Sequence, residues 1–242
     1  MKTRMFHACS TFGNIMKVTY YGHACFAVEV AGKKLLFDPF ITYNELAKHI
    51  DINTIYADYV LVSHGHMDHI ADAVAIAKRN DAKAIGNYEV AEWLHKNGVE
   101  KYHPMNHGGK WKFSFGTVKL VNAVHTSSFA DGSYAGNPVG FVIESAEGNF
   151  YYSGDTALTM DMQLIPMTCG KLNFALLNLG DNFTMGIDDA VLAAQFVKCN
   201  KVIALHYDTF GYIKIDKEEA KAKFAAQGIE LIFIEIGGTV EV

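Results

Sequence analysis

The chain has 242 residues, of which 50% are hydrophobic and 19% are charged, so it can bury a substantial core and is not intrinsically disordered. Its formal net charge of −5 argues against a general nucleic-acid binder, which usually carries a basic face. The four cysteines form no CxxC pair, and no apolar run reaches the ~20 residues that a membrane span needs. We therefore expect a cytoplasmic protein with reduced thiols and no membrane association.

The N-terminal segment lacks the continuous apolar stretch of a secretory signal, although it contains Lys2 and Arg4. Met16 stands directly before the first strand-like run, at 17–21. We therefore expect residues 1–15 to be an extension outside the fold and residues 16–242 to form a single domain.

Short β-type runs dominate the first third of the chain. Runs at 18–21, 25–30 and 34–37 predict a three-stranded meander, and Asp38-Pro39 ends its third strand because proline cannot continue the hydrogen-bonded ladder. A short helix is expected at 43–50. Then the pattern predicts a buried strand at 59–62, a helix at 68–79, a strand at 83–85 and a helix at 88–96.

The second half repeats this order of strands and helices. Hairpins are expected to pair 111–115 with 117–121, and 139–144 with 149–153. Further strands are predicted at 174–179, 201–205, 231–235 and 239–242, with helices at 188–198 and 216–227. No linker separates the two β-then-α halves, so we predict an α/β domain in which two mixed sheets pack face to face with helices outside.

The densest chemistry lies directly after the strand at 59–62. His64, His66, Asp68 and His69 place three imidazoles and one carboxylate within six positions, and these groups suit zinc, iron or manganese. One contiguous loop cannot wrap a single ion with all four groups. The motif therefore predicts two neighbouring ions, with His64 and His66 on one and Asp68 and His69 on the other.

Three further candidate ligands are far apart in sequence, and each follows a strand-like run: His125, Asp155 and His206. A fold that brings several strand ends to one edge would add them to the motif. Gly154 allows a tight turn before Asp155, and a carboxylate can bridge two cations.

In order and spacing, these residues resemble the metallo-β-lactamase superfamily, whose fold is an αββα sandwich. More narrowly, the chain looks like the UPF0173 family of metal-dependent hydrolases, which are related to the ascorbate-6-phosphate lactonases. Five segments carry this resemblance: YYGHACF at 20–26, DPF at 38–40, SGDT at 153–156, FTMG at 183–186 and HYDTF at 206–210. The sequence departs from the family at Asp181, where a second glycine is commoner.

The resemblance implies a role for each candidate ligand. Metal 1 would be bound by His64, His66 and His125, and metal 2 by Asp68, His69 and His206, with Asp155 bridging the two. Zinc is the first expectation for both ions, with manganese, iron or nickel as alternatives. Two cations about 3.5–4 Å apart generate a bridging hydroxide, which would attack a small ester, lactone or phosphodiester.

Several neighbouring residues are candidates for supporting roles. His23 lies in a turn and is expected either to line the pocket, as a third catalytic group beside Asp68 and Asp155, or to hold the turn. His23 and Tyr207 are the first candidates for a general acid. Asp38 is expected to hydrogen-bond a ligating histidine. The hydroxyls at 126–128 could contact substrate or only water, and Asp181 is expected to be solvated.

Three other functions stay open. The superfamily's nucleases carry the same motif but normally add RNA-binding arms or an inserted domain, and neither is evident here. Flavodiiron proteins replace the second histidine of the motif, here His66, with glutamate and usually carry a flavin domain. A non-catalytic metal-binding scaffold is the third. We expect a small-molecule substrate rather than nucleic acid, and the composition is compatible with a homo-oligomer.

Overall fold

The computed structural model describes residues 15–242, so the proposed N-terminal extension, apart from Ile15, lies outside the described residues. The chain forms two seven-stranded mixed sheets. The first sheet has the order β14-β1-β2-β3-β4-β5-β6, with β1 at Lys17–Gly22, β2 at Cys25–Val30, β3 at Lys33–Phe37, β4 at Tyr59–Val62, β5 at Lys83–Asn87, β6 at Tyr102–Met105 and β14 at Thr239–Glu241. The second sheet has the order β13-β12-β11-β10-β9-β8-β7, with β7 at Lys110–Phe113, β8 at Gly116–Asn122, β9 at Val139–Glu144, β10 at Asn149–Tyr152, β11 at Phe174–Asn178, β12 at Lys201–Leu205 and β13 at Glu230–Ile232.

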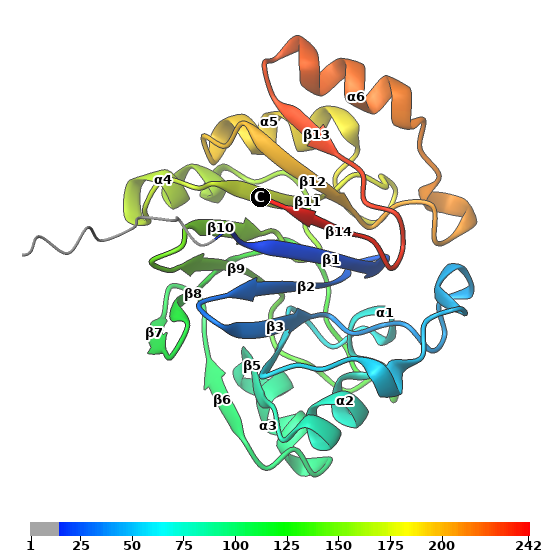
Figure 1. Ribbon diagram of the computed structural model, residues 1–242, viewed down its shortest axis with the longest axis vertical. Coiled ribbons are helices and arrows are strands. Elements are labelled where there is room, and N and C mark those ends of the chain that lie inside the picture. Colours follow the sequence, from blue (N-terminus) through cyan, green and yellow to red (C-terminus); the bar gives the residue numbers. More distant parts are fainter. Residues whose placement is uncertain (1–14) are drawn as a thin grey trace, which may run out of the picture.

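Helices cover the outer face of each sheet, which gives four layers (Figure 1). They are α1 at Met67–Ile70, α2 at Ala73–Asn80, α3 at Tyr88–Lys96, α4 at Ile165–Thr168, α5 at Ile187–Phe196 and α6 at Lys217–Ala226. Short 3-10 turns lie at Glu45–Ala47, Ile52–Thr54, Met160–Leu164 and Gly211–Ile213. The predicted α/β fold, two mixed sheets face to face with helices outside, is confirmed. None of the helices within residues 15–242 is long and apolar enough to cross a bilayer.

The core between the two sheets is built largely from aromatic side chains. Phe37 of the first sheet contacts Phe141, Phe150 and Tyr152 of the second, edge to face, with ring centroids 5.7–6.0 Å apart. Separate apolar clusters fill the space between each sheet and its helices. This packing holds the sheets in a fixed relative position, which sets the position of the loops at their edges.

Parallel strands in both sheets end at the same edge of the sandwich. β3, β4, β5 and β6 are parallel to one another, as are β10, β11, β12 and β13. Backbone hydrogen bonds join the two halves at this edge: Val139 N donates to Ser63 O at 3.0 Å, and His206 N donates to His23 O at 2.8 Å. The loops after these strands therefore converge on one place.

Some expected elements differ from those observed. The helix expected at 68–79 is two helices, α1 and α2, because Asp72 is drawn toward the loop after β3. Its backbone N donates to Pro39 O at 2.9 Å, and its carboxylate accepts from the backbone N of Ile41 and Thr42. The helix expected at 43–50 is a single 3-10 turn, β13 ends at Ile232, and β6 was not expected.

Candidate metal centre

The seven predicted ligands come together at the shared strand edge. His64 and His66 follow β4, Asp68 and His69 lie on α1, and the other three follow β8, β10 and β12. Six of them, all but Asp155, fall into two of the three groups of residues whose candidate ligand atoms lie within 4.8 Å of one another, and His23 joins the second of these. The first group is His64, His66 and His125, and the second is His23, Asp68, His69 and His206.

Asp155 lies between the two groups. Its Oδ2 atom is 2.9 Å from His206 Nε2 and 3.2 Å from His69 Nε2, both in the second group, and 3.7 Å from His125 Nε2 in the first. Asn178 Nδ2 donates to the other carboxylate oxygen, Oδ1, at 3.0 Å. One oxygen is thus fixed by the protein, and the other faces both histidine groups.

The donor set fits metal ions because it contains buried nitrogens without hydrogen-bond partners. His69 Nε2 and both ring nitrogens of His206 are buried and make no well-oriented hydrogen bond among the described residues, although Asp155 Oδ2 is close. In the first group, His64 Nε2 and His66 Nδ1 lie 3.0 Å apart. Buried polar atoms normally have partners, so nitrogens that converge in this way match a site that binds cations.

Asp38 forms hydrogen bonds that hold His69 of the cluster in place. It is fully buried, and its Oδ2 accepts hydrogen bonds from His69 Nδ1 at 2.8 Å and from the hydroxyls of Ser63 and Tyr152 at 2.5 Å each. The expected hydrogen bond between Asp38 and a histidine of the cluster is therefore present. Because His69 donates from Nδ1, its Nε2 is the nitrogen that faces the site and would bind a cation.

The same network orients His64. The Ser63 hydroxyl donates to Asp38, so its oxygen can accept from His64 Nδ1, which lies 3.0 Å away. This leaves the lone pair of His64 on Nε2, on the side of His66. The buried carboxylate of Asp38 thus orients both rings: His69 directly, and His64 through the Ser63 hydroxyl.

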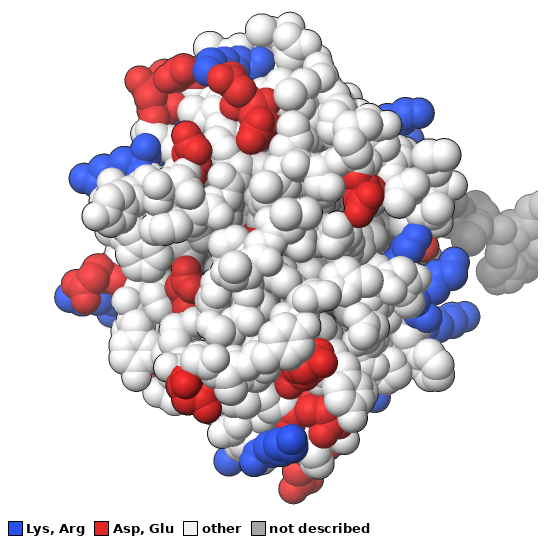
Figure 2. Space-filling view, turned by 180° about the vertical axis from the view of Figure 1, so that it is seen from behind, with Lys and Arg blue, Asp and Glu red and all other residues white. Residues whose placement is uncertain are grey.

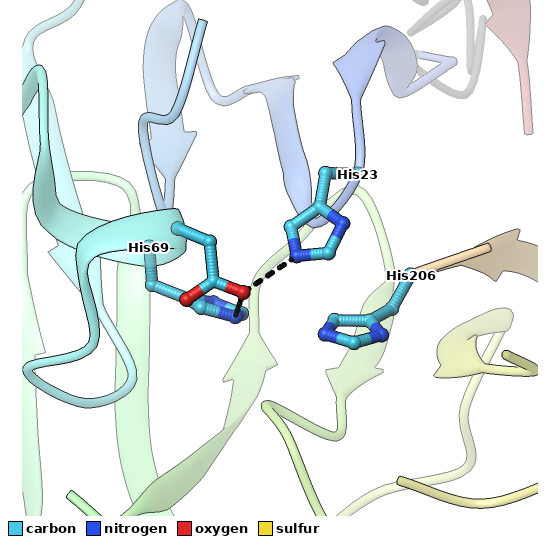
Figure 3. Close-up of side chains that lie close together, drawn as sticks. His23, His69 and His206 are labelled. Atoms are coloured by element: carbon cyan, nitrogen blue, oxygen red, sulfur yellow. Dashed lines mark hydrogen bonds and ion pairs between the residues drawn. The ribbon is translucent and has the colours of Figure 1, made fainter. Parts of the chain in front are cut away.

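His23 is buried behind the cluster. Its side chain has no exposed surface, and it is not among the residues that line the cavity in front of the cluster. Nε2 lies 3.1 Å from Asp68 Oδ2, and Nδ1 lies 3.0 Å from Thr209 Oγ1. Figure 3 shows the rings of His23, His69 and His206 facing one another from three separate elements. His23 is therefore placed to orient Asp68.

Burial and neighbouring charges prepare the cluster for cations. Burial lowers the pKa of His64 well below its usual value, and burial together with His206 lowers the pKa of His23 to about 4. Burial alone would raise the pKa of Asp155, but His206 and His69 outweigh it and hold that pKa well below its ordinary range. At His69, burial is outweighed by Asp155 and Asp68, which raise its pKa well above the usual value, so a cation that binds there would displace a proton. A neutral imidazole and an ionised carboxylate are the forms that bind metal.

Two glycines permit the close packing of these loops. A Cβ at Gly65, between His64 and His66, would collide with Ala135 Cβ. Gly154 has φ +60°, and a Cβ there would collide with Val139 O. His23 and His206 both have φ 55°, in the left-handed region that non-glycine residues rarely adopt. Such backbone is typical of functional sites, where packing enforces it.

A cavity of about 450 Å³ opens in front of the cluster. His66, Asp68, His125, Asp155 and His206 line its inner end. Thr126 and Ser128 also line it, whereas Ser127 does not, because its hydroxyl donates to Ala135 O. The volume is that of a site for a small molecule.

Tyr207 is not placed to act as a general acid in this cavity. Its ring stacks on Tyr20 at 6.4 Å between centroids and contacts Phe233, on the opposite side of the strand end from His206. Tyr207 lines a different cavity, and the left-handed backbone of His206 turns the chain between the two side chains. The prediction for Tyr207 is therefore wrong.

Sequence reasoning missed the residues that support the cluster from other elements. Asn178, Ser63 and Tyr152 all contact the cluster or Asp38. Asn178 and Ser63 left a signal, because each is a polar residue at the end of an apolar run, at 174–178 and 59–62. Buried polar groups need partners, so such a position points to a hydrogen-bond network.

Comparison with known proteins agrees with this geometry. Residues 33–207 match the model of the beta-lactamase superfamily domain. A UPF0173 metal-dependent hydrolase from Christiangramia forsetii is 56% identical over 93% of this chain and 100% of its own length. Another UPF0173 metal-dependent hydrolase, from Flavobacterium johnsoniae, is 52% identical over the same shares.

Solved structures show the same relationship. Igni18, a metallo hydrolase from Ignicoccus hospitalis, has a TM-score of 0.85 and 34% identity, covering 95% of this chain and 99% of its own. An isothiocyanate hydrolase from Delia radicum gut bacteria, at 19% identity and a TM-score of 0.73 over 93% and 98%, shares the fold. This chain therefore belongs to the beta-lactamase superfamily and, within it, to the UPF0173 metal-dependent hydrolases.

Proposed function

We propose that this protein is a dinuclear hydrolase that cleaves a small ester, lactone or phosphodiester. One ion would be held by His64, His66 and His125, the other by Asp68, His69 and His206, with Asp155 shared. Zinc suits this set of imidazoles and carboxylates best, and manganese, iron or nickel can bind the same groups.

The position of Asp155 carries the proposal for two ions. Its Oδ2 lies within 3.7 Å of nitrogens from both histidine groups. The first group offers three further donors and the second offers four, of which His23 already contacts Asp68. A single ion would leave one group of converging nitrogens without a partner. Two ions that share one carboxylate would give both groups a partner.

The chain's own residues position and protect the reacting groups. Two bound ions would lower the pKa of a shared water and supply hydroxide as the nucleophile. Asp38 holds Nε2 of His69 toward the site, and His23 fixes the carboxylate of Asp68. Thr126 and Ser128 present hydroxyl or backbone groups to a substrate in the cavity.

We also propose that the substrate is a small molecule rather than a nucleic acid. No lysine or arginine is among the residues that line the cavity in the described part of the chain, and nucleic-acid affinity depends on such side chains. On the face drawn in Figure 2, basic side chains lie toward the margins and the centre carries few charges. The cavity lining favours an uncharged or weakly charged ligand, and the face in Figure 2 shows no continuous basic patch of the kind that binds nucleic acid.

Metal content and turnover of the Asp155→Asn variant test the proposal. We expect about two ions per chain in the wild-type protein by elemental analysis, and at most about one in the variant, because the amide removes the shared anionic oxygen. Turnover of the best substrate from a panel of esters, lactones, thioesters and phosphodiesters should fall by at least about 100-fold.

Asp188→Asn is the matched control. Asp188 is an exposed carboxylate that pairs with Lys223 on the surface. This variant should keep both ions and full turnover. A wild-type protein that binds a single ion, or an Asp155→Asn variant that retains full turnover, would contradict the proposal.

A further inference from the structure

Apart from the metal-binding residues, the lining of the cavity is largely apolar. It includes Met67, Phe129, Phe183 and Phe210. Phe129 is buried, but Met67, Phe183 and Phe210 are 46%, 51% and 38% exposed. Large apolar side chains gathered around a cavity mouth form a surface that binds apolar groups.

The segments of the chain that supply the lining are also poor in lysine and arginine. Neither residue type occurs at 120–170 or at 172–197. The segment after β12 has none before Lys214, which lines a different cavity. An anionic group remote from the metal centre would therefore lose its hydration at the mouth without gaining a partner.

We propose that this cavity selects small neutral acyl compounds with an apolar or aryl group, and that Phe183 and Phe210 determine this selectivity. The inference rests on the proposed hydrolase function and narrows its substrate class. It excludes substrates that carry a phosphate, carboxylate or sulfonate group at the end remote from the scissile bond.

Both phenylalanines are held in place by neighbouring rings. Phe210 packs edge to face on His23 at 5.3 Å between centroids and also contacts Phe40 at 6.4 Å. Phe183 contacts Tyr212 edge to face at 6.2 Å. An aromatic group of the substrate would meet an apolar wall of rings, and aryl contacts of this kind favour offset or edge-to-face geometry.

A matched pair of esters tests the proposal. Phenyl acetate and 4-acetoxybenzenesulfonate differ only in a sulfonate at the end remote from the ester. Hydrolysis of either adds hydroxide to the acyl carbon, breaks the acyl C–O bond and releases acetate and the phenol. The sulfonate makes the phenol a better leaving group, so a preference for phenyl acetate would originate in binding. We expect that preference to be about tenfold or more in kcat/KM.

The Phe183→Arg variant should reverse this preference. Its guanidinium would pair with the sulfonate, so kcat/KM for 4-acetoxybenzenesulfonate should rise and that for phenyl acetate should fall. Trp111→Arg is the control, since Trp111 is a similarly exposed aromatic residue, at 56%, on β7 and outside the cavity lining. This control adds the same charge and should leave the ratio unchanged.

Binding of the corresponding amides gives a readout without turnover. Acetanilide should bind to the wild-type protein, with and without added zinc, at least about ten times more tightly than 4-acetamidobenzenesulfonate. Phe183→Arg should reverse this order in titration calorimetry. Equal or tighter binding of the sulfonate by the wild-type protein, or no binding of acetanilide, would overturn the proposal. Metal-dependent turnover of other esters alongside such a result would leave the hydrolase function intact.

Discussion

Two sets of residues around the metal centre reverse the usual distribution of polar and apolar groups. The floor, which we define as Asp38, Ser63, Tyr152 and Asn178, is polar and fully buried. The mouth, which we define as Met67, Phe183 and Phe210, is apolar and exposed. The floor fixes which nitrogens and oxygens face the metal centre, whereas the mouth contacts whatever enters. We therefore expect the floor to set the chemistry of the metal centre and the mouth to set the substrate preference.

Substitutions in the floor and in the mouth should also differ in their energetic cost. In a buried polar network each member depends on the others, because a donor that loses its acceptor stays unsatisfied in a medium of low dielectric constant. At the mouth, a lost side chain is replaced by water at little cost to folding. We therefore expect changes in the floor to affect stability and metal affinity together, and changes in the mouth to affect substrate binding alone.

The largest effect is expected for Asp38→Asn. The new amide cannot accept from His69 Nδ1, Ser63 and Tyr152 together, so the free energy of unfolding should fall by about 3 kcal/mol. Zinc affinity should fall by about 10- to 100-fold because His69 is no longer oriented. Urea denaturation with a chelator present measures the first quantity, and competition titration with zinc measures the second.

Asp72→Asn separates these two effects. Asp72 is also buried, and its carboxylate accepts three hydrogen bonds, from Ile41 N, Thr42 N and Thr42 Oγ1. It makes no hydrogen bond to the metal centre among the contacts of the described residues. This variant should lose a similar amount of stability but keep its zinc affinity within about threefold. An equal loss of affinity in both variants would mean that general destabilisation, not histidine orientation, explains the effect.

A smaller effect is expected for Asn178→Ala. Asp155 Oδ1 would lose its amide donor, and Gly154 O would lose the bond that Asn178 Nδ2 donates at 2.9 Å. The free energy of unfolding should fall by about 1–2 kcal/mol, and zinc affinity by about tenfold. Thermal unfolding and zinc titration measure these changes.

Asn173→Ala is the comparison for this variant, since Asn173 lies just before the other end of the same strand. It is exposed, and its Oδ1 accepts from Asn149 N at 2.9 Å. It should lose under about 1 kcal/mol of stability and none of its zinc affinity. A loss of affinity there would show that β11 as a whole, rather than its polar end, supports Asp155.

The sequence was sufficient to predict the fold and the residues that meet at the sheet edge. The spacing of His64, His66, Asp68 and His69 after a buried strand limits where their side chains can lie. His125, Asp155 and His206 were found because each also follows a strand, and such strands end at one edge. The candidate ligands could therefore be identified from the local pattern of strand-like runs.

The supporting network could not be predicted in the same way. Tyr152 lies 114 residues from Asp38, and nothing local to Tyr152 indicates their hydrogen bond. The break between α1 and α2 likewise depends on contacts of Asp72 with a loop about 30 residues earlier. Such features arise from the packing of the two sheets and require the tertiary structure. The orientation of Tyr207 also belongs to this class.

The smallest effect is expected at Asp181, in the loop that precedes Phe183. Its φ of 59° lies in the left-handed region, which glycine adopts without strain. The carboxylate partly offsets this strain because its Oδ1 accepts from Asn182 N at 2.7 Å. Asp181→Gly should therefore change the free energy of unfolding by under about 0.5 kcal/mol, and Asp181→Ala should lower it by about 1 kcal/mol, in urea denaturation.

The same two variants test whether the loop at Asp181 holds Phe183 in position at the mouth. Asp181→Ala keeps the strain and removes the hydrogen bond that fixes Asn182, so Phe183 should be held less firmly, and KM for phenyl acetate should rise about threefold with kcat unchanged. Asp81 has a similar φ of 52° at the end of α2, outside the cavity lining. Asp81→Ala should lose comparable stability without any change in KM. If KM rises equally in both variants, the effect comes from lower stability, and the position of Phe183 depends on its contact with Tyr212 rather than on the Asp181 turn.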